Sequence, residues 1–331
     1  MSVHPTRLKS LNEADARNGD YVLYWMQQSQ RAVYNHALEF AIQQANKLDR
    51  MPLVVFGLMD DYPEANLRHY TFMLEGLKET QAALASRGIK MVLNLGHPPE
   101  VALSFGRRAS MMICDRGYLR HQRAWRREVA KQAQCPVVQV ESDVVVPVEV
   151  ASEKAEYAAR TIRPKIHRYL ETYLVGLKQT RVKHPSLGMK IKEVELEDTE
   201  GLLRKLNLDR SVPPVSDLFK GGTFQAIKRF DGFVRHRLKY YDQQSNQPQT
   251  NDISHMGPYL HFGQISPLYL ALKMNRAPDS LKAVKDAYIT EVSFERMVEA
   301  SDFIPFSQVP VPIELRYRLQ TLRNACTSRD N

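Results

Sequence analysis

Apolar runs and amphipathic stretches alternate along the first half of the chain. Short runs rich in β-branched and aromatic residues, typical of buried strands, span residues 21–26, 53–58, 91–95, 110–114 and 137–140. Helical periodicity separates them, over residues 31–48, 67–87, from Pro98 onward, and 120–134. Strands that alternate with helices form βαβ units. The pattern therefore predicts an α/β fold whose N-terminal part is a doubly wound, Rossmann-like parallel sheet.

The second half of the chain follows a different pattern. Residues 167–213 mix charged side chains with Pro185 and Gly188 and indicate an extended, partly helical connector. Residues 224–241 favour one basic amphipathic helix, with Phe230 and Phe233 facing inward. We expect an α/β domain over residues 1–150, a linker over 151–213 and a helical domain over 214–331.

Composition narrows the protein class. The 331 residues are 43% hydrophobic and 25% charged, which is ordinary for a globular protein of two domains. No apolar run reaches membrane-spanning length, the N-terminus lacks a secretory signal, and three scattered cysteines suit neither a disulfide framework nor a metal cluster. We expect a cytoplasmic protein without a membrane segment. The net charge of +9 favours a polyanionic partner.

Polar residues follow the predicted strands where ligands of such sheets bind. Residues 25–27, 59–60 and 115–117 should lie along the carboxyl edge of the sheet. Neither a GxGxxG nor a GxxxxGK[ST] pattern occurs there, so a dinucleotide fingerprint and a P-loop are unsupported. The basic, aromatic stretch over residues 115–127 has two interpretations, a phosphate contact or a solvated helix face.

A second candidate site is the stretch NDISHMGPYLHFGQIS, residues 251–266. Ser254 and Gly257 are small enough for backbone amides to approach a phosphate or a ring. Pro258 suits the start of a helix. The alternative interpretation is a core helix that begins at Pro258 and buries one hydrogen-bonded histidine.

The segment PYLHFGQIS resembles a hallmark of the photolyase and cryptochrome flavoproteins. Residues 24–31, residues 70–77 and the segment over residues 152–166 are similar to class II cyclobutane pyrimidine dimer photolyases. The resemblance extends from about residue 8 to residue 291. It implies an FAD cofactor, a possible deazaflavin or folate antenna in the α/β domain, and a monomer that acts on DNA containing pyrimidine dimers.

The resemblance also implies roles for individual residues. Tyr241, Ser254, His255, Met256 and Gly257 match positions that bind the flavin cofactor, and His255 stands where the family often has Asn. Glu291 matches a catalytic glutamate that contacts the thymine bases. In this family, reduced FAD absorbs light and donates the electron that splits the dimer.

The sequence departs from the class II pattern near its end. Ser245 replaces an Arg that enters the DNA where the lesion flips out, and Glu295 replaces a Trp that stacks on the dimer. The two tryptophans, Trp25 and Trp125, both lie in the first domain, so the family's relay of tryptophans is missing. We therefore expect a C-terminally truncated photolyase with an incomplete all-helical flavin-binding domain and impaired repair. The alternatives are a non-catalytic remnant that binds an antenna chromophore or nucleic acid, and a cryptochrome-like sensor.

Overall fold

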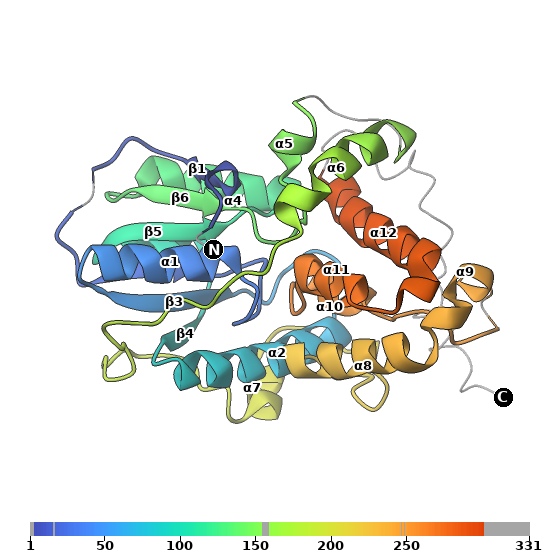
Figure 1. Ribbon diagram of the computed structural model, residues 1–331. Helices are drawn as coiled ribbons and strands as arrows, with labels where there is room; N and C mark the ends of the chain where they lie inside the picture. The colour runs from blue at the N-terminus through green and yellow to red at the C-terminus, as the bar shows by residue number, and fades with distance from the viewer. Residues whose placement is uncertain (1–2, 16, 154–158, 246, 248, 301–331) are drawn as a thin grey trace.

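The computed structural model describes residues 3–15, 17–153, 159–245, 247 and 249–300, with the backbone alone for residues 159–160 and 294–300. Its centre is a six-stranded sheet in the order β1-β6-β5-β2-β3-β4, and only the β1–β6 pair is antiparallel (Figure 1). The strands are β1 (Leu8–Ser10), β2 (Tyr21–Trp25), β3 (Met51–Leu58), β4 (Lys90–Leu95), β5 (Ala109–Asp115) and β6 (Val137–Val140). The predicted parallel, doubly wound sheet is confirmed.

Strand β2 lies between the two halves of the parallel sheet. The chain first adds β3 and β4 on one side of β2, then crosses back and adds β5 and β6 on the other. Trp25, the last residue of β2, is paired with Cys114 near the end of β5. The carboxyl ends of β2 and β5 therefore form the switch point, where ligands of doubly wound sheets bind.

Helices cover both faces of the sheet. Helices α1 (His36–Lys47) and α2 (Leu67–Ser86) share a hydrophobic cluster with one face, while α3 (Pro98–Gly106) and α4 (Arg120–Gln132) pack on the other. Buried side chains alternate accordingly along β2, where Val22 and Tyr24 belong to the first cluster and Leu23 and Trp25 to the second.

A third hydrophobic cluster belongs mainly to the helical part of the chain. Its core combines Phe230, Phe233 and Tyr288 with the buried segment 144–146, which is a loop and not a strand. The helices after the sheet are α5 (Val148–Ala151), α6 (Ala159–Tyr173), α7 (Thr199–Lys205), α8 (Thr223–His236), α9 (Tyr241–Gln244), α10 (Gly257–His261), α11 (Pro267–Asn275) and α12 (Lys282–Ala300), with short 3-10 turns at Pro5–Arg7, Leu238–Tyr240 and Asp279–Leu281. Figure 1 shows α8 to α12 beyond the carboxyl edge of the sheet, while α7 packs against α2 and belongs to the first cluster.

Two helix predictions were wrong at their ends. Helix α1 begins at His36 and not at Arg31, because Asn35 caps it by accepting a hydrogen bond from the Leu38 N–H at 3.0 Å. The predicted single helix over residues 224–241 breaks at Arg237, whose guanidinium donates to the Asn251 carbonyl at 3.0 Å. The break turns Tyr241 into the core.

The connector between the two parts is fastened along the sheet. The Ser186 N–H donates to the Gly88 carbonyl at 2.9 Å and the Val194 N–H donates to the Leu93 carbonyl at 2.8 Å. Residues 186–194 therefore run beside β4 as an extended, fixed strap that precedes α7. Within the described residues, no helix is both long and apolar enough to cross a membrane, and no cluster of His, Cys, Asp and Glu has the arrangement of a metal site.

Candidate functional site

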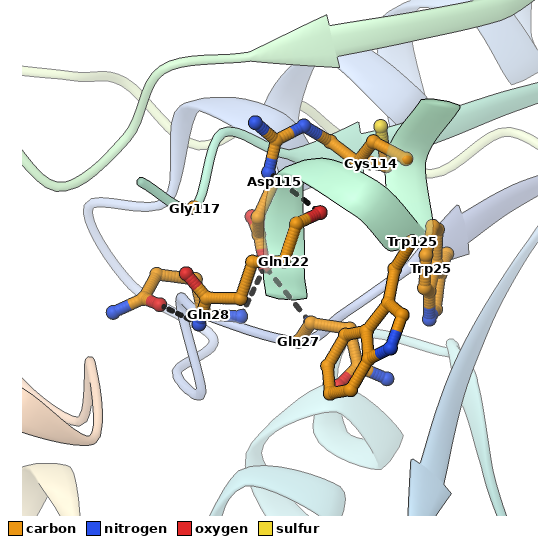
Figure 2. Close-up of a pocket in the computed structure, with 9 residues that line it drawn as sticks. Trp25, Gln27, Gln28, Cys114, Asp115, Gly117, Gln122 and Trp125 are labelled. Carbon is orange, nitrogen blue, oxygen red and sulfur yellow. Dashed lines mark hydrogen bonds between the residues drawn. The ribbon is translucent and has the colours of Figure 1, made fainter. Parts of the chain in front are cut away.

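A pocket opens at the switch point of the sheet, between the ends of β2 and β5 (Figure 2). Its cavity volume is about 10 Å³, and a wider empty space of about 260 Å³ includes the solvent at its mouth. Its wall consists of Trp25, Gln27, Gln28, Cys114, Asp115, Gly117, Gln122, Trp125 and Arg126. Four of these, Trp25, Gln27, Asp115 and Gly117, come from the rim that the sequence predicted. The other five include three residues of α4, which the sequence analysis interpreted as a phosphate contact or solvated surface.

Two buried N–H donors in this wall lack partners. The Trp25 Nε1 and Gln27 Nε2 atoms are buried without a hydrogen-bond partner among the described residues. A buried donor that is left unsatisfied costs about 1–3 kcal/mol, so native proteins rarely keep one. The two donors therefore call for an acceptor within the pocket.

Arg126 adds a cation to the same wall. Burial lowers the pKa of its guanidinium. In the described part of the chain Arg126 forms no ion pair, and its guanidinium donates a long hydrogen bond of 3.3 Å to the Gln122 carbonyl. A partly buried cation without a carboxylate favours a ligand that carries negative charge.

An aromatic group forms one side of the pocket. The Trp125 ring lies 4.9 Å from the His121 ring and 5.6 Å from the His97 ring, both edge-on. The Tyr62 hydroxyl and His121 Nε2 are 2.8 Å apart. Such edge-to-face rings give a rigid wall on which a planar ligand can stack.

The pocket floor is held by Asp115. Its Oδ2 atom accepts hydrogen bonds from the backbone N–H groups of Gln27, Gln28 and Ser29 at 2.9–3.0 Å, and its Oδ1 atom accepts one from the Tyr24 hydroxyl at 2.7 Å. Burial raises the pKa of Asp115, and the carboxylate of Asp143 raises it further. Both carboxylate oxygens of Asp115 accept hydrogen bonds from the protein itself. A ligand would therefore be bound by the other residues of the pocket wall.

The loop after β2 also reaches the hallmark stretch of the helical part. The Arg31 Nη1 atom donates to Asp143 Oδ1 at 2.6 Å and to the Gly263 carbonyl at 2.8 Å. Gly263 has φ of +64°, and a Cβ at this position would lie 1.8 Å from the Gln28 carbonyl oxygen. Only glycine allows this approach.

Gln264 fastens the hallmark stretch to two further helices. Its buried side chain accepts a hydrogen bond from the Gly222 N–H at 2.7 Å and donates to the Phe72 carbonyl at 3.1 Å. A Cβ on Gly76 would lie 2.1 Å from Gln264 Nε2. The FGQ part of the motif therefore joins α2, which covers the sheet, to the start of α8, a role that the sequence alone did not indicate.

Tyr241 and Glu291, both predicted as site residues, meet in the helical part. The Tyr241 hydroxyl donates a short hydrogen bond to the Glu291 carboxylate. The buried Tyr241 ring packs edge-on against Phe233 and Tyr288, with centroids 5.6 Å apart in both pairs. The aromatic cluster thus fixes the phenol, and the phenol orients the carboxylate.

The other predicted residues form the loop before α10. Ser254 and Met256 are buried, and the Ser254 hydroxyl accepts a hydrogen bond from the Met256 N–H at 3.4 Å. His255 adopts φ of +56° and pairs through Nε2 with Asn251, while Gly257 begins α10. Met256 belongs to the same hydrophobic cluster as Tyr241, so the loop and the Tyr241–Glu291 pair border one core.

These residues fit the phosphate end of a dinucleotide cofactor. Arg237 supplies positive charge beside the loop through its hydrogen bond to the Asn251 carbonyl. The left-handed φ of His255 turns the backbone between Ser254 and the start of α10, and turns with such a residue can form anion-binding concavities. Ser245 ends α9, and Glu295 lies in the part of α12 whose side chains are outside the described residues.

Comparison with known proteins gives a consistent result. Residues 22–186 match the family model for DNA photolyase. The chain is 40% identical to a deoxyribodipyrimidine photo-lyase of Methanothermobacter thermautotrophicus, over 98% of this chain and 75% of that protein. It is 35% identical to the deoxyribodipyrimidine photo-lyase of Potorous tridactylus, over 78% of this chain and 49% of that protein.

Solved structures share the fold at low sequence identity. A bacterial class III photolyase from Agrobacterium tumefaciens superposes with a TM-score of 0.66 at 15% identity, covering 87% of this chain and 60% of its own. An archaeal photolyase from Sulfolobus tokodaii, described with two FAD molecules, superposes with a TM-score of 0.60 at 14% identity, covering 84% of this chain and 60% of its own. The chain thus spans half to three quarters of the relatives that it matches.

Proposed function

Because the chain belongs to the DNA photolyase family, we propose that it is an FAD-dependent protein that uses light to split cyclobutane pyrimidine dimers in DNA. The observation that carries the proposal is the 40% identity with an archaeal deoxyribodipyrimidine photo-lyase over 98% of this chain. Such a span includes both the sheet and the Tyr241–Glu291 pair. We further propose the division into an α/β domain over residues 1–150, a connector over 151–213 and a helical cofactor domain from residue 214.

The loop before α10 and its neighbours would hold the cofactor. Ser254, His255, Met256 and Gly257 would surround the phosphates with a hydroxyl and backbone N–H groups, and Arg237 would neutralise part of their charge. Tyr241 would border the same site. Reduced FAD, when bound and excited by light, supplies the electron that opens the cyclobutane ring.

Glu291 would act on the lesion. A carboxyl group at this place can accept or share a hydrogen bond with a pyrimidine base, and the Tyr241 hydroxyl holds the carboxylate in one orientation. Tyr241 is in turn held by Phe233 and Tyr288. The chain's own contribution is therefore orientation and hydrogen bonding, and the cofactor carries the electron chemistry.

We assign the protein to class II on sequence segments 24–31, 70–77 and 152–166, of which residues 154–158 lie outside the described residues. Within that class, Ser245 lacks the long cationic side chain that would fill a vacated base stack. Base extrusion costs about a few kcal/mol, so we propose weaker lesion binding than in class II proteins with Arg at this position.

The pocket at the switch point would hold an antenna chromophore. Trp25 Nε1, Gln27 Nε2 and Arg126 offer two donors and a cation, and Trp125 offers a stacking surface. A deazaflavin or a folate has both a planar ring and acceptor oxygens. If the helical site fails to bind FAD, this pocket supports the second candidate function, a chromophore-binding protein without repair activity.

The test is the visible absorption spectrum of the full chain after dialysis against FAD. Flavin bands that stay with the protein are expected, with a lower flavin content in Arg237→Gln and an unchanged content in Lys228→Gln, an exposed charge on α8. Illumination of the loaded protein with a dimer-containing oligonucleotide should then restore normal bases, with a dark sample as control. A protein that retains no flavin, or that repairs equally in the dark, contradicts the proposal.

A further inference from the structure

Helix α4 carries a concentrated positive charge on the α/β domain. Its 13 residues include five basic side chains and one acidic side chain, a net charge of +4 against +9 for the whole chain. Nearly half of the net charge therefore lies in one helix. This exceeds what a solvated helix face needs for solubility, because such faces usually mix both signs.

Three of these side chains lie in a row. Arg120, Arg127 and Lys131 are exposed, and at about 3.6 residues per turn they fall within about 40° of one another around the helix. We call these three residues the α4 ridge. None of them forms an ion pair with another described residue. The ridge is about 16 Å long, at about 1.5 Å per residue.

We propose that the α4 ridge is a second, sequence-independent contact for the phosphate backbone of DNA. Its length equals about five base-pair steps of a duplex, at about 3.4 Å each. Phosphate contacts made by Arg and Lys supply most of non-specific affinity and steer a protein toward DNA. Helix α4 lies on the face of the sheet opposite α1, whereas α9 and α12, which carry Tyr241 and Glu291, lie in the helical part (Figure 1).

The composition of α4 favours DNA over a lipid surface. The helix has one buried residue among those described, Val129, which packs on the sheet, and its N-cap residue Leu119 is an exposed large apolar side chain. A helix that binds in a membrane interface needs an exposed apolar face, which α4 lacks. Arg126 is directed into the switch-point pocket and is not part of the ridge.

The experiment measures binding of undamaged fluorescent duplex DNA to the full chain across a series of salt concentrations. The ridge variant carries R120Q, R127Q and K131Q together. The matched control carries K178Q, K190Q and K192Q, three exposed lysines of the connector, and loses the same charge. The slope of log affinity against log salt should fall by about 2–3 in the ridge variant, near 0.9 per lost contact, and stay at the wild-type value in the control.

Equal slopes in the two variants overturn the proposal, because general charge would then explain the binding. Loss of binding to phosphatidylserine vesicles with DNA binding intact also overturns it. If the ridge variant melts below the control, R127Q and K131Q are compared singly, each with an expected slope change of about 0.9. Because undamaged DNA is the probe, the result is independent of flavin content and of repair.

Discussion

Arg31 and Asp143 form a buried ion pair, with 2.6 Å between Nη1 and Oδ1 and side chains that are 0% and 3% exposed. The same Arg31 nitrogen donates to the Gly263 carbonyl at 2.8 Å. One guanidinium thus joins the loop after β2 to the hallmark stretch of the helical part. The site described above depends on this junction for its position.

Replacing Arg31 with Met should lower the free energy of unfolding by about 3–5 kcal/mol, because Asp143 is left as a buried charge without its partner. The measurement is urea unfolding at neutral pH. The control is Lys9→Met, which removes an exposed pair with Glu149 that is worth at most about 1 kcal/mol. A loss below 1 kcal/mol for Arg31→Met means that the pair does not hold the two parts together.

A second prediction concerns two glycines with opposite surroundings. Gly76→Ala should lower stability by about 1–3 kcal/mol, because the new methyl group meets the amide of Gln264. Gly232→Ala lies in the interior of α8, where nothing outside the helix's own neighbouring backbone is within 4 Å of the new carbon, and should raise stability by about 0.5–1 kcal/mol. Thermal melting of both variants measures the difference. Similar melting temperatures would show that the Gln264 contact is loose.

Stability should also depend on pH through His36. Burial holds the pKa of His36 well below its ordinary value, and the charges of Arg7 and Arg31 lower it further. The unfolded chain takes up a proton below about pH 6.5, but the folded chain keeps the imidazole neutral. The free energy of unfolding is therefore unaffected by His36 above about pH 6.5. It decreases as the pH falls from there toward the pKa of the folded state, by up to about 1.4 kcal/mol per pH unit.

The variant His36→Gln tests this linkage, since it removes the titrating group at similar size. Between pH 7 and pH 5 the free energy of unfolding should fall less steeply for the variant than for the wild type. The difference in slope should correspond to the uptake of about one proton on unfolding. The exposed histidine variant His236→Gln should keep the wild-type slope. An unchanged slope in His36→Gln would assign the pH dependence to other groups.

A substitution in the switch-point pocket should affect stability and chromophore affinity differently. Trp25→Phe removes an N–H that has no partner within the described residues, so the unliganded protein should be no less stable apart from the lost ring area. Affinity for an antenna chromophore should fall about tenfold or more, at about 1.4 kcal/mol per factor of ten. Titration of the protein with a deazaflavin or a folate, followed by absorption, measures this. Unaltered affinity would remove Trp25 from the chromophore contacts.

Much of the fold could be predicted because the buried strands are recognisable in the sequence as apolar runs. Leu53, Val54 and Val55 are buried in β3 as the pattern required. Strand β1 was missed because its three residues, Leu8 to Ser10, contain one apolar side chain. The loop over residues 27–35 was predicted in part as helix, since periodicity cannot show that Asp115 collects three backbone N–H groups from it.

The sequence could predict individual residues of the candidate site where a motif or the family resemblance covers them, but it could not predict the contacts between distant residues. Tyr241 and Glu291, 50 residues apart, were each identified separately, but their hydrogen bond depends on how α12 packs. Arg126 and Trp125 looked like surface residues because an amphipathic pattern shows which face is polar and not what lies beneath it. Gln264 looked like one more motif residue, and only the structure shows its contacts with Phe72 and Gly222.

The strap beside β4 has a consequence for the behaviour of the protein at high concentration. The open edge of a sheet offers unpaired N–H and C=O groups to other chains and invites edge-to-edge aggregation. On the β4 edge, the Val194 N–H of the connector donates a hydrogen bond to the Leu93 carbonyl. On the opposite edge, β1 is only three residues long and carries Lys9. Cleaving the connector should therefore expose the edge of β4 and make it a template for strand pairing between molecules.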